Sequence, residues 1–402
     1  MVRHMVFDLM RETPPRVPSG SFPSDLSRYV GLGMGLFRSR LVTGRPFFLA
    51  HAVTFGCNSR CQTCSYWKLT PRMNEDLPTE GVYALLDDAY AAGMRGYYLF
   101  GGEPLVRKDI SAIVDHANRR GFFTCMNTNG SLLSAKAPSL MGLDVAFVSL
   151  DYYDAYHDVI RGHPGNFDQV RRGVERIRNV AGTKVTLVST ISTLNGLESM
   201  EPLAQLAQEW HVGISFNSIE PTLDFGLTDS DHSPNLRFEF DPPTLHRFYV
   251  EVLRLKRAGY PLMETEEILR DYVAGKPWKC EFDRMFVYVS PDQQIYSCDY
   301  RYGYDLRRGS FEQYFGSREF REHTKSIETC NRCVRTCVRN YAYIYQLHPL
   351  HLYHLLRNAA ALYRPTVPPP SGSISPPSVP GSQRRRLWGS ARAVGTTPSR
   401  KT

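Results

Sequence analysis

Short apolar runs rich in β-branched and aromatic residues alternate with longer amphipathic stretches over the first half of the chain. Runs of the first kind are typical of buried strands, and stretches of the second kind are typical of helices. The predicted strands lie at residues 49–55, 96–100, 122–127, 145–150, 184–191 and 212–219. The predicted helices lie at residues 79–93, 109–120, 133–141, 167–180 and 199–210. Six such units predict an α/β fold whose parallel sheet curls into an open, three-quarter barrel.

The pattern changes after the sixth strand. Residues 220–240 are polar and read as a connection, and a helix predicted at 241–256 follows with prolines in its first turn. The runs Met285–Val289 and Ile295–Cys298 then flank a turn and predict a β-hairpin. A smaller hairpin and helix subdomain is therefore expected behind the barrel.

Three cysteines follow the first strand at the spacing C-x3-C-x2-C: Cys57, Cys61 and Cys64. Three thiolates at that spacing can ligate three irons of a [4Fe–4S] cube and leave the fourth iron open to a small molecule. Zinc is the alternative for such a triplet. The chain has nine cysteines, an odd and grouped set that indicates metal ligands kept reduced, so a cytoplasmic location is expected.

Glycine-rich and polar motifs follow the next three strands. They are Gly101-Gly102-Glu103-Pro104, Asn127-Thr128-Asn129-Gly130 and Ser149-Leu150-Asp151. Ligands collect at the carboxyl ends of parallel strands because the connecting loops converge there. Two consecutive glycines also let the backbone approach a ligand without interference from a Cβ atom. One rim of the barrel is therefore expected to hold all of these motifs.

Further along, His157-Asp158, Arg161-Gly162 and Gly165-Asn166-Phe167-Asp168 complete an ordered series of motifs. This series resembles the radical S-adenosylmethionine (SAM) enzymes, in the branch that contains the molybdenum-cofactor cyclase and the peptide-modifying enzymes with SPASM or twitch extensions. The resemblance covers roughly residues 48–345. It implies a partial (β/α)6 barrel, SAM, and a catalytic [4Fe–4S] cluster held by the three cysteines. It also implies an electron donor such as flavodoxin or ferredoxin.

The resemblance assigns further residues to SAM. In this family the Gly-Gly-Glu-Pro segment binds the methionine amino group, which points to Gly101, Gly102 and Glu103, with Glu103 supplying the negative charge. The remaining implied SAM contacts are Arg107, Thr128, Ser149 and Arg161. Each has an alternative: Arg107 as a solvated arginine at a helix start, the two hydroxyls as caps, and Arg161 as a partner of Asp158.

A second group of cysteines resembles the twitch extension, in which hairpin cysteines and a downstream C-x2-C ligate one auxiliary [4Fe–4S] cluster. The group comprises Cys280, Cys298, Cys330, Cys333 and Cys337. Four thiolates suffice, so we assign the first four and keep Cys337 as the alternate. A zinc knuckle is the competing interpretation. Cys125, alone inside a strand, is expected to be a small buried core residue.

The formal charge of +8 comes mostly from residues 365–402, which contain six basic residues and no acidic one, and leaves about +2 for the rest. This argues against a nucleic-acid-binding surface. The same proline-rich segment is expected to be disordered, with a weak anchor to anionic lipid as the alternative. No signal peptide or membrane-spanning run is visible, so the protein is expected to be soluble or peripheral.

Five segments are therefore expected along the chain. They are an N-terminal extension (1–44), a radical SAM core (45–245), an auxiliary-cluster domain (246–345), a helical segment (346–364) and the basic tail (365–402). The aromatic stretch from Tyr341 to Tyr363 is expected to pack on the barrel mouth or to face lipid.

The function implied by the resemblance is reductive cleavage of SAM, followed by removal of a hydrogen atom from a substrate. The substrate classes left open are a ribosomal peptide, a small molecule and a lipid. A non-catalytic iron–sulfur protein is the alternative from another class, and the intact Gly-Gly-Glu motif argues against it.

Overall fold

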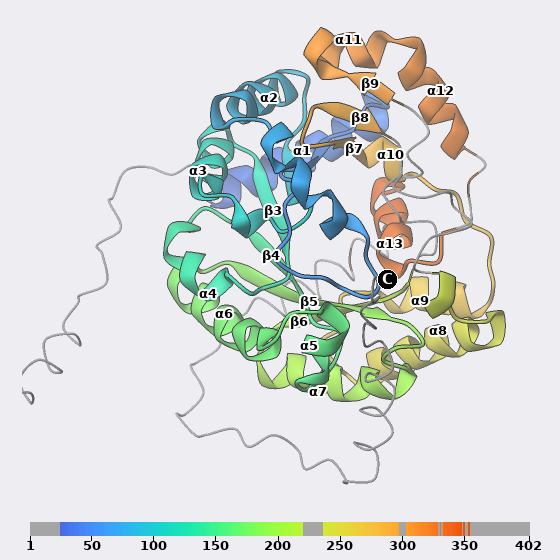
Figure 1. The fold of residues 1–402 in the computed structure, drawn as a ribbon. Helices are drawn as coiled ribbons and strands as arrows, with labels where there is room; N and C mark the ends of the chain where they lie inside the picture. The colour runs from blue at the N-terminus through green and yellow to red at the C-terminus, as the bar shows by residue number, and fades with distance from the viewer. Residues whose placement is uncertain are drawn as a thin grey trace, which may run out of the picture. The chain divides into compact units, whose positions relative to one another are not determined.

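The computed structural model describes residues 25–219, 236–296, 303–328, 330, 333–347, 349 and 353. Within these residues nine strands form one sheet, in the order β6-β5-β4-β3-β2-β1-β7-β8-β9 (Figure 1). The strands are β1 (Phe48–Ala52), β2 (Gly96–Phe100), β3 (Phe123–Thr128), β4 (Val145–Ser149), β5 (Lys184–Ile191), β6 (Gly213–Ser218), β7 (Phe286–Val289), β8 (Gln294–Tyr296) and β9 (Gly303–Asp305).

Strands β1 to β6 pair in parallel, each with its neighbour in sequence, which confirms the α/β barrel. Helices on the outer side connect them: α2 (Thr79–Ala91), α3 (Ile110–Arg120), α4 (Leu133–Lys136), α5 (Tyr156–Arg161), α6 (Asn166–Ala181) and α7 (Met200–Glu209). Each predicted strand is found within three residues of its expected ends.

The hairpin expected behind the barrel extends the same sheet. β7 pairs in parallel with β1, with Phe48 opposite Phe286, and β8 and β9 continue in antiparallel fashion. The helices of this part are α8 (Pro242–Arg257), α9 (Glu266–Val273), α10 (Phe282–Met285), α11 (Phe311–Gly316), α12 (Arg318–Ile327) and α13 (Thr336–Tyr345). The boundary expected at residue 245 stays a prediction.

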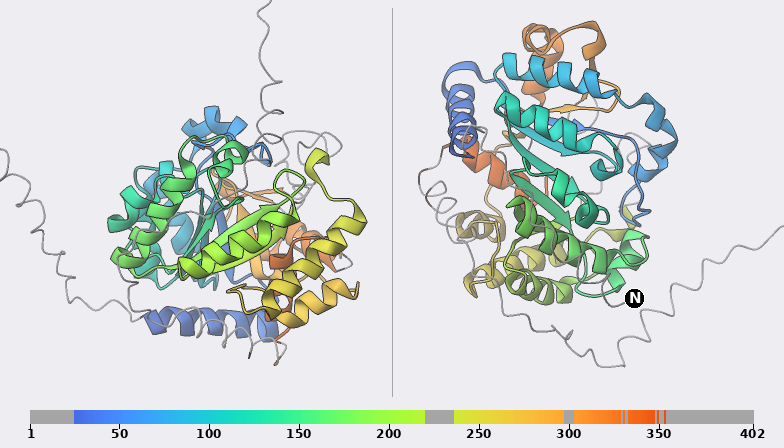
Figure 2. Two further views of the ribbon diagram at one scale, coloured as in Figure 1. Left: turned by 90° about the horizontal axis from the view of Figure 1, so that it is seen from below. Right: turned by 90° about the vertical axis from the view of Figure 1, so that its left-hand side faces the viewer.

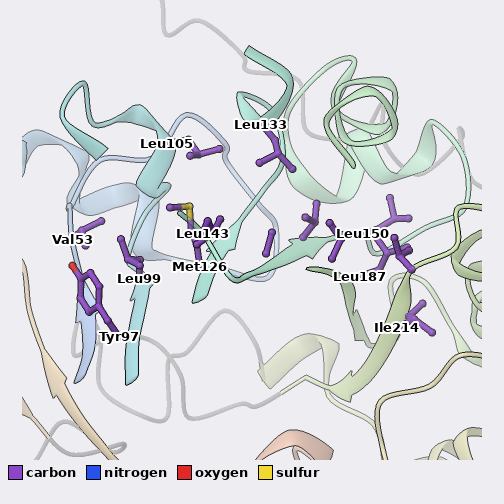
Figure 3. Packing of buried hydrophobic residues seen from close by; sticks show 14 of the residues in the cluster. Val53, Tyr97, Leu99, Leu105, Met126, Leu133, Leu143, Leu150, Leu187 and Ile214 are labelled. Atoms are coloured by element: carbon purple, nitrogen blue, oxygen red, sulfur yellow. The ribbon is translucent and has the colours of Figure 1, made fainter. Parts of the chain in front are cut away.

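Side chains of the strands alternate between two apolar layers. In β2, Tyr97 and Leu99 face the outer helices, whereas Tyr98 and Phe100 face the concave side. Figure 3 shows Tyr97 and Leu99 among other residues of the core between the sheet and the outer helices. Aromatic contacts fill the concave side, where the Tyr98 ring lies 6.2 Å from that of Phe147. The sheet is therefore buried on both faces, as parallel sheets generally are.

α13 crosses the concave side between the two edges of the barrel (Figure 1). The Thr336 hydroxyl at its start donates to the Phe216 carbonyl of β6 at 2.6 Å, and the Tyr341 ring lies 5.1 Å from that of Phe286 in β7. The helix begins five residues before the aromatic stretch that the sequence singled out. It narrows the opening that a three-quarter barrel was expected to leave.

α1 (Asp25–Arg38) lies across the end of the barrel at which the strands begin (Figure 2). The buried Arg28 guanidinium pairs with Asp144, just before β4, at 2.7 Å, and the Tyr29 ring contacts that of Phe123 at the start of β3. The π-helical turn η2 (Ser39–Thr43) continues α1 and ends in Gly44 with φ of 64°. No helix of the described residues has both the length and the apolar character needed to cross a membrane.

Short 3-10 turns complete the described structure. They are η3 (Tyr66–Glu75), η4 (Pro104–Val106), η5 (Ala137–Ser139), η6 (Leu197–Ser199), η8 (Leu236–Phe238) and η9 (Leu306–Arg308). Cys298, the tail at 365–402 and most of 346–364 lie outside the described residues, so the expectations for them remain untested.

The Arg28–Asp144 pair predicts a large effect of removing one partner. Replacing Asp144 by Ala leaves the Arg28 charge buried, so the free energy of unfolding should fall by about 3–5 kcal/mol in urea titrations. The matched control is Glu322→Ala, which breaks an exposed pair with Arg318 and should lower stability by less than about 1 kcal/mol. Equal effects of the two substitutions would contradict the anchoring role of α1.

Candidate active site

The C-x3-C-x2-C loop leaves the carboxyl end of β1 and places Cys57, Cys61 and Cys64 at partly buried positions. The backbone N–H of Cys57 donates to the Thr70 hydroxyl of η3 at 3.2 Å. The N–H of Tyr66 donates to the Cys64 sulfur at 3.4 Å. The turn that follows the loop therefore holds both of its ends.

The carbonyl groups at the end of α5 hold the middle of the cysteine loop. The N–H groups of Arg60 and Gln62 donate to the carbonyl oxygens of Arg161 and Ile160 at 3.1 and 2.9 Å. α5 ends at Gly162 with φ of 55°, and a Cβ atom there would lie 2.4 Å from the Arg60 carbonyl oxygen. A glycine is therefore required where the helix end meets the loop.

The two glycines after β2 lie directly against the start of the cysteine loop. The N–H groups of Gly102 and Glu103 donate to the carbonyls of Thr54 and Gly56 at 3.1 and 2.8 Å. A Cβ atom on Gly102 would lie 2.0 Å from the Gly56 oxygen, and one on Gly101 would lie 2.7 Å from the Thr54 oxygen. The glycines thus allow two backbone segments to meet, which is a structural role and does not require a bound ligand.

Glu103 is buried and receives three hydrogen bonds from the rim. Its Oε1 accepts from the Leu105 N–H at 3.0 Å and the Thr128 hydroxyl at 2.7 Å, and its Oε2 accepts from the Asn129 N–H at 2.6 Å. Burial raises the pKa of the Glu103 carboxyl to about 7, although the three donors favour its ionised form. A carboxylate has about four lone-pair sites, so one on Oε2 is left for a further donor.

Asn129 connects this carboxylate to the cysteine loop. Its side-chain amide donates to Asn58 Oδ1 at 2.8 Å and to the Ser59 hydroxyl at 2.9 Å. Ser59 in turn lies 2.9 Å from His163 Nδ1. The ends of β2 and β3 and the cysteine loop therefore form one hydrogen-bonded rim.

Arg161 pairs with Asp151 at 2.7 Å, and its positive charge also acts on the Cys61 thiol. Asp158, its partner in the alternative derived from the sequence, instead accepts from the N–H groups of Gly165 and Phe167 and caps α6. Burial raises the pKa of Cys61, and the Arg161 guanidinium opposes that shift. Arg161 is thus placed to stabilise negative charge on this sulfur.

Arg107 is buried rather than solvated. Its guanidinium donates to the carbonyls of Val53 and Leu77 at 2.7 and 3.0 Å and makes two hydrogen bonds to Asp109. These hydrogen bonds use the N–H donors of Arg107 on partners in the protein itself, one of which is just before the cysteine loop. Contact of Arg107 with a SAM carboxylate remains a prediction. Ser149 lies partly buried at the end of β4, and its contact with SAM also remains a prediction.

Burial disfavours the thiolate form of the loop cysteines. Burial raises the pKa of Cys57 and Cys64 to about 12, so both thiols remain protonated until a metal displaces the proton. In the described part of the chain, no three His, Cys, Asp or Glu side chains are close enough to hold one metal ion. A cube needs a wider arrangement, because each thiolate binds a different iron.

The second cysteine group gathers on the concave side near α13. Cys280 belongs to a buried cluster with the aromatic rings of β7 and α13, and the partly buried Cys330, Cys333 and Cys337 pack against that cluster. The Cys280 N–H donates to the Cys330 carbonyl at 3.2 Å, and the Cys337 N–H donates to Asn217 Oδ1 at 3.3 Å. Cys125 is buried in the same cluster, at the position expected for it.

The sequence interpretation gave no role to Asp151, Ser59 or His163. Asp151 lies two residues beyond the end of β4, and a carboxylate close to a strand end was the available signal for it. Ser59 and His163 carry no comparable signal, because their contact joins positions more than a hundred residues apart.

Comparisons with known proteins agree with this geometry. Residues 52–209 match the family model described as the Radical SAM superfamily. Fe-coproporphyrin III synthase of Methanosarcina barkeri is 34% identical over 138 residues, which is 34% of each chain. AdoMet-dependent heme synthase of the same organism is 30% identical over 141 residues, or 34% of this chain and 40% of that one. The chain thus spans about a third to two-fifths of these curated relatives.

Solved structures share the fold at low sequence identity. Streptococcus suis SuiB bound to precursor peptide SuiA has a TM-score of 0.54 and 12% identity, covering 81% of this chain and 77% of that chain. The structure of anSMEcpe with bound AdoMet (SAM) has a TM-score of 0.54 and 15% identity, covering 78% and 99%. The family match shows that residues 52–209 form a radical SAM domain, and the members of that superfamily are enzymes that use a [4Fe–4S] cluster and SAM.

Proposed function

We propose that this protein cleaves SAM reductively and removes a hydrogen atom from a peptide or small-molecule substrate. The observation that carries the proposal is the cysteine loop, held at the carboxyl ends of the strands directly beside a buried carboxylate with a lone pair to spare. A bound [4Fe–4S] cluster, reduced by an electron donor, would supply the one electron for reductive cleavage of SAM, and the nucleoside radical so formed would take the hydrogen atom from the substrate.

Cys57, Cys61 and Cys64 would hold this cluster. Arg161 lies against the Cys61 sulfur and compensates the negative charge that three thiolates bring into a partly buried site. Arg60 and Lys68 lie exposed on and beside the loop, and they provide positive charge for an acidic electron donor such as flavodoxin or ferredoxin.

Glu103 would orient SAM through the methionine ammonium group. The Leu105, Thr128 and Asn129 donors fix the direction of the carboxylate, so an ammonium group meets an acceptor that needs no rearrangement. In this proposal Thr128 acts through Glu103 and not by direct contact with SAM. Gly101 and Gly102 bring the loop and the carboxylate together.

The substrate class is the open part of the proposal. The curated relatives are named for heme and Fe-coproporphyrin III synthesis, whereas two structures of similar fold contain peptides. Aromatic side chains gather on the concave side, including Phe100 and Tyr288 with ring centroids 5.8 Å apart. An apolar lining would limit side reactions of a radical with water for either class of substrate.

The second cysteine group would hold an auxiliary [4Fe–4S] cluster. Cys280, Cys330, Cys333 and Cys337 come from two parts of the chain and pack against the same apolar cluster, which supports a common ligand set. The sequence resemblance assigns Cys298 as a ligand and keeps Cys337 as the alternate, and Cys298 lies outside the described residues.

Replacing Cys57, Cys61 and Cys64 together by Ala should abolish the formation of 5′-deoxyadenosine from SAM, since the thiolates that bind the catalytic cluster are lost. The readouts are the nucleoside, measured by chromatography after anaerobic reconstitution and reduction, and the iron content, which should fall by about four per chain. The matched control is Cys125→Ala, a buried cysteine in a strand, which should retain both. Undiminished nucleoside formation in the triple variant would overturn the assignment.

The same triple variant should keep about four irons per chain, because the second cysteine group supplies its thiolates independently. Replacing all five cysteines of the second group (Cys280, Cys298, Cys330, Cys333 and Cys337) by Ala in the triple variant should remove this iron as well. Zinc in place of the remaining iron, or no metal at all, would refute the auxiliary [4Fe–4S] cluster.

Glu103→Gln should weaken SAM binding at least tenfold, since removing the charge loses an ion pair with the ammonium and sets an amide against three donors. Equilibrium dialysis with labelled SAM measures the effect, and iron content shows whether the cluster remains. Thr128→Val keeps the carboxylate and removes one donor, so its effect should be smaller. If Thr128→Val weakens binding as much as Glu103→Gln, the charge of Glu103 is not what binds the ammonium group.

A further inference from the structure

α1 and η2 expose an apolar stripe to solvent. Val30, Met34, Phe37 and Leu41 are 51%, 66%, 52% and 69% exposed, and Val42 beside them is 78% exposed. The spacing of four, three and four residues places the first four on one face of the helix. Among the described residues, six of the eleven exposed large apolar side chains lie between positions 29 and 42, so the exposure is concentrated and not scattered.

The opposite face of the same helix already packs on the barrel. Arg28 and Ser39 are 5% and 2% exposed, and Gly35 lies against the Arg95 side chain. The Ser39 hydroxyl donates to the Arg45 carbonyl at 2.6 Å, which fixes the junction with η2. The rotation of the helix about its axis is therefore set by the buried face, and the apolar stripe is directed outward.

The charged residues of α1 and η2 after Asp25 are all basic. Arg38 and Arg40 are exposed next to Phe37 and Leu41, and residues 26–74 contain no acidic residue. A second copy of the chain would bring the same arginines against this surface, because a twofold interface pairs a patch with itself. A fitting partner must combine an apolar interior with negative charge at its surface, as an anionic lipid layer does.

We infer that α1 and η2 dock the protein on an anionic lipid surface, with the helix in the plane of the interface and the stripe inserted among the acyl chains. α1 covers the end of the barrel at which the strands begin, so the cysteine loop at the carboxyl ends of the strands faces away from the lipid (Figure 2). This docking surface is made of residues other than 365–402, and the inference does not depend on the proposed function.

The test uses the full-length protein and vesicles of phosphatidylcholine with or without phosphatidylglycerol, at low ionic strength. The wild type should sediment with the anionic vesicles, and the triple variant Met34→Glu, Phe37→Glu, Leu41→Glu should stay in solution. Arg38→Gln with Arg40→Gln should weaken binding roughly thirtyfold, about 1 kcal/mol for each arginine. Val180→Glu with Val250→Glu is the control, because both residues are similarly exposed on other helices, and it should bind as the wild type does.

Every variant keeps the basic tail, so vesicle binding that survives the triple substitution would place the lipid contact elsewhere and overturn the inference. Absence of wild-type binding to anionic vesicles would overturn it as well. A wild-type dimer that only the triple variant dissociates, measured by sedimentation equilibrium, would assign the stripe to a second copy. Circular dichroism and SAM cleavage should be unchanged in the triple variant, since its substitutions are exposed and lie at the far end of the barrel.

Discussion

The contact between the cysteine loop and the end of β2 is the interaction on which the site depends. Two backbone hydrogen bonds join Gly102 and Glu103 to Thr54 and Gly56, at a separation that leaves no room for a Cβ atom on Gly102. Because the contact is made by backbone, it fixes the distance between the backbone of the cysteine loop and that of Glu103 without depending on a rotamer. The end of α5 and Asn129 then hold the remaining parts of the loop against the same rim.

The barrel could be predicted from sequence because its strands are buried on both faces and its helices on one. Burial on both faces and burial on one face leave different patterns of apolar residues in the sequence, and the strands and helices were long enough for each pattern to be detected. The positions of the cysteine loop and of the Gly-Gly-Glu segment followed from the strands that precede them. The pairing of β7 with β1 could not be predicted from such patterns, since the sequence of a strand does not indicate which edge of the sheet it pairs with.

The roles of individual charged residues were harder to predict than their positions. Arg161 was weighed against Asp158 because they are three residues apart, yet its partner is Asp151 from the preceding strand end, while Asp158 caps the following helix. Arg107 was weighed as a ligand or a solvated residue, and the structure shows a third arrangement in which it binds carbonyls more than twenty residues away. Such partners are chosen by tertiary packing, on which local spacing carries no information.

The parallel pairing of β1 with β2 on one side and with β7 on the other has a mechanical consequence. A hinge needs a segment that can absorb large changes of φ and ψ between two bodies, and an unbroken sheet offers none across this seam. The two cysteine groups are therefore fixed on one rigid frame, whether or not the chain divides into domains by sequence. Any opening that admits a substrate must come from the loops and helices around that frame, because a swing of one half against the other would break the sheet.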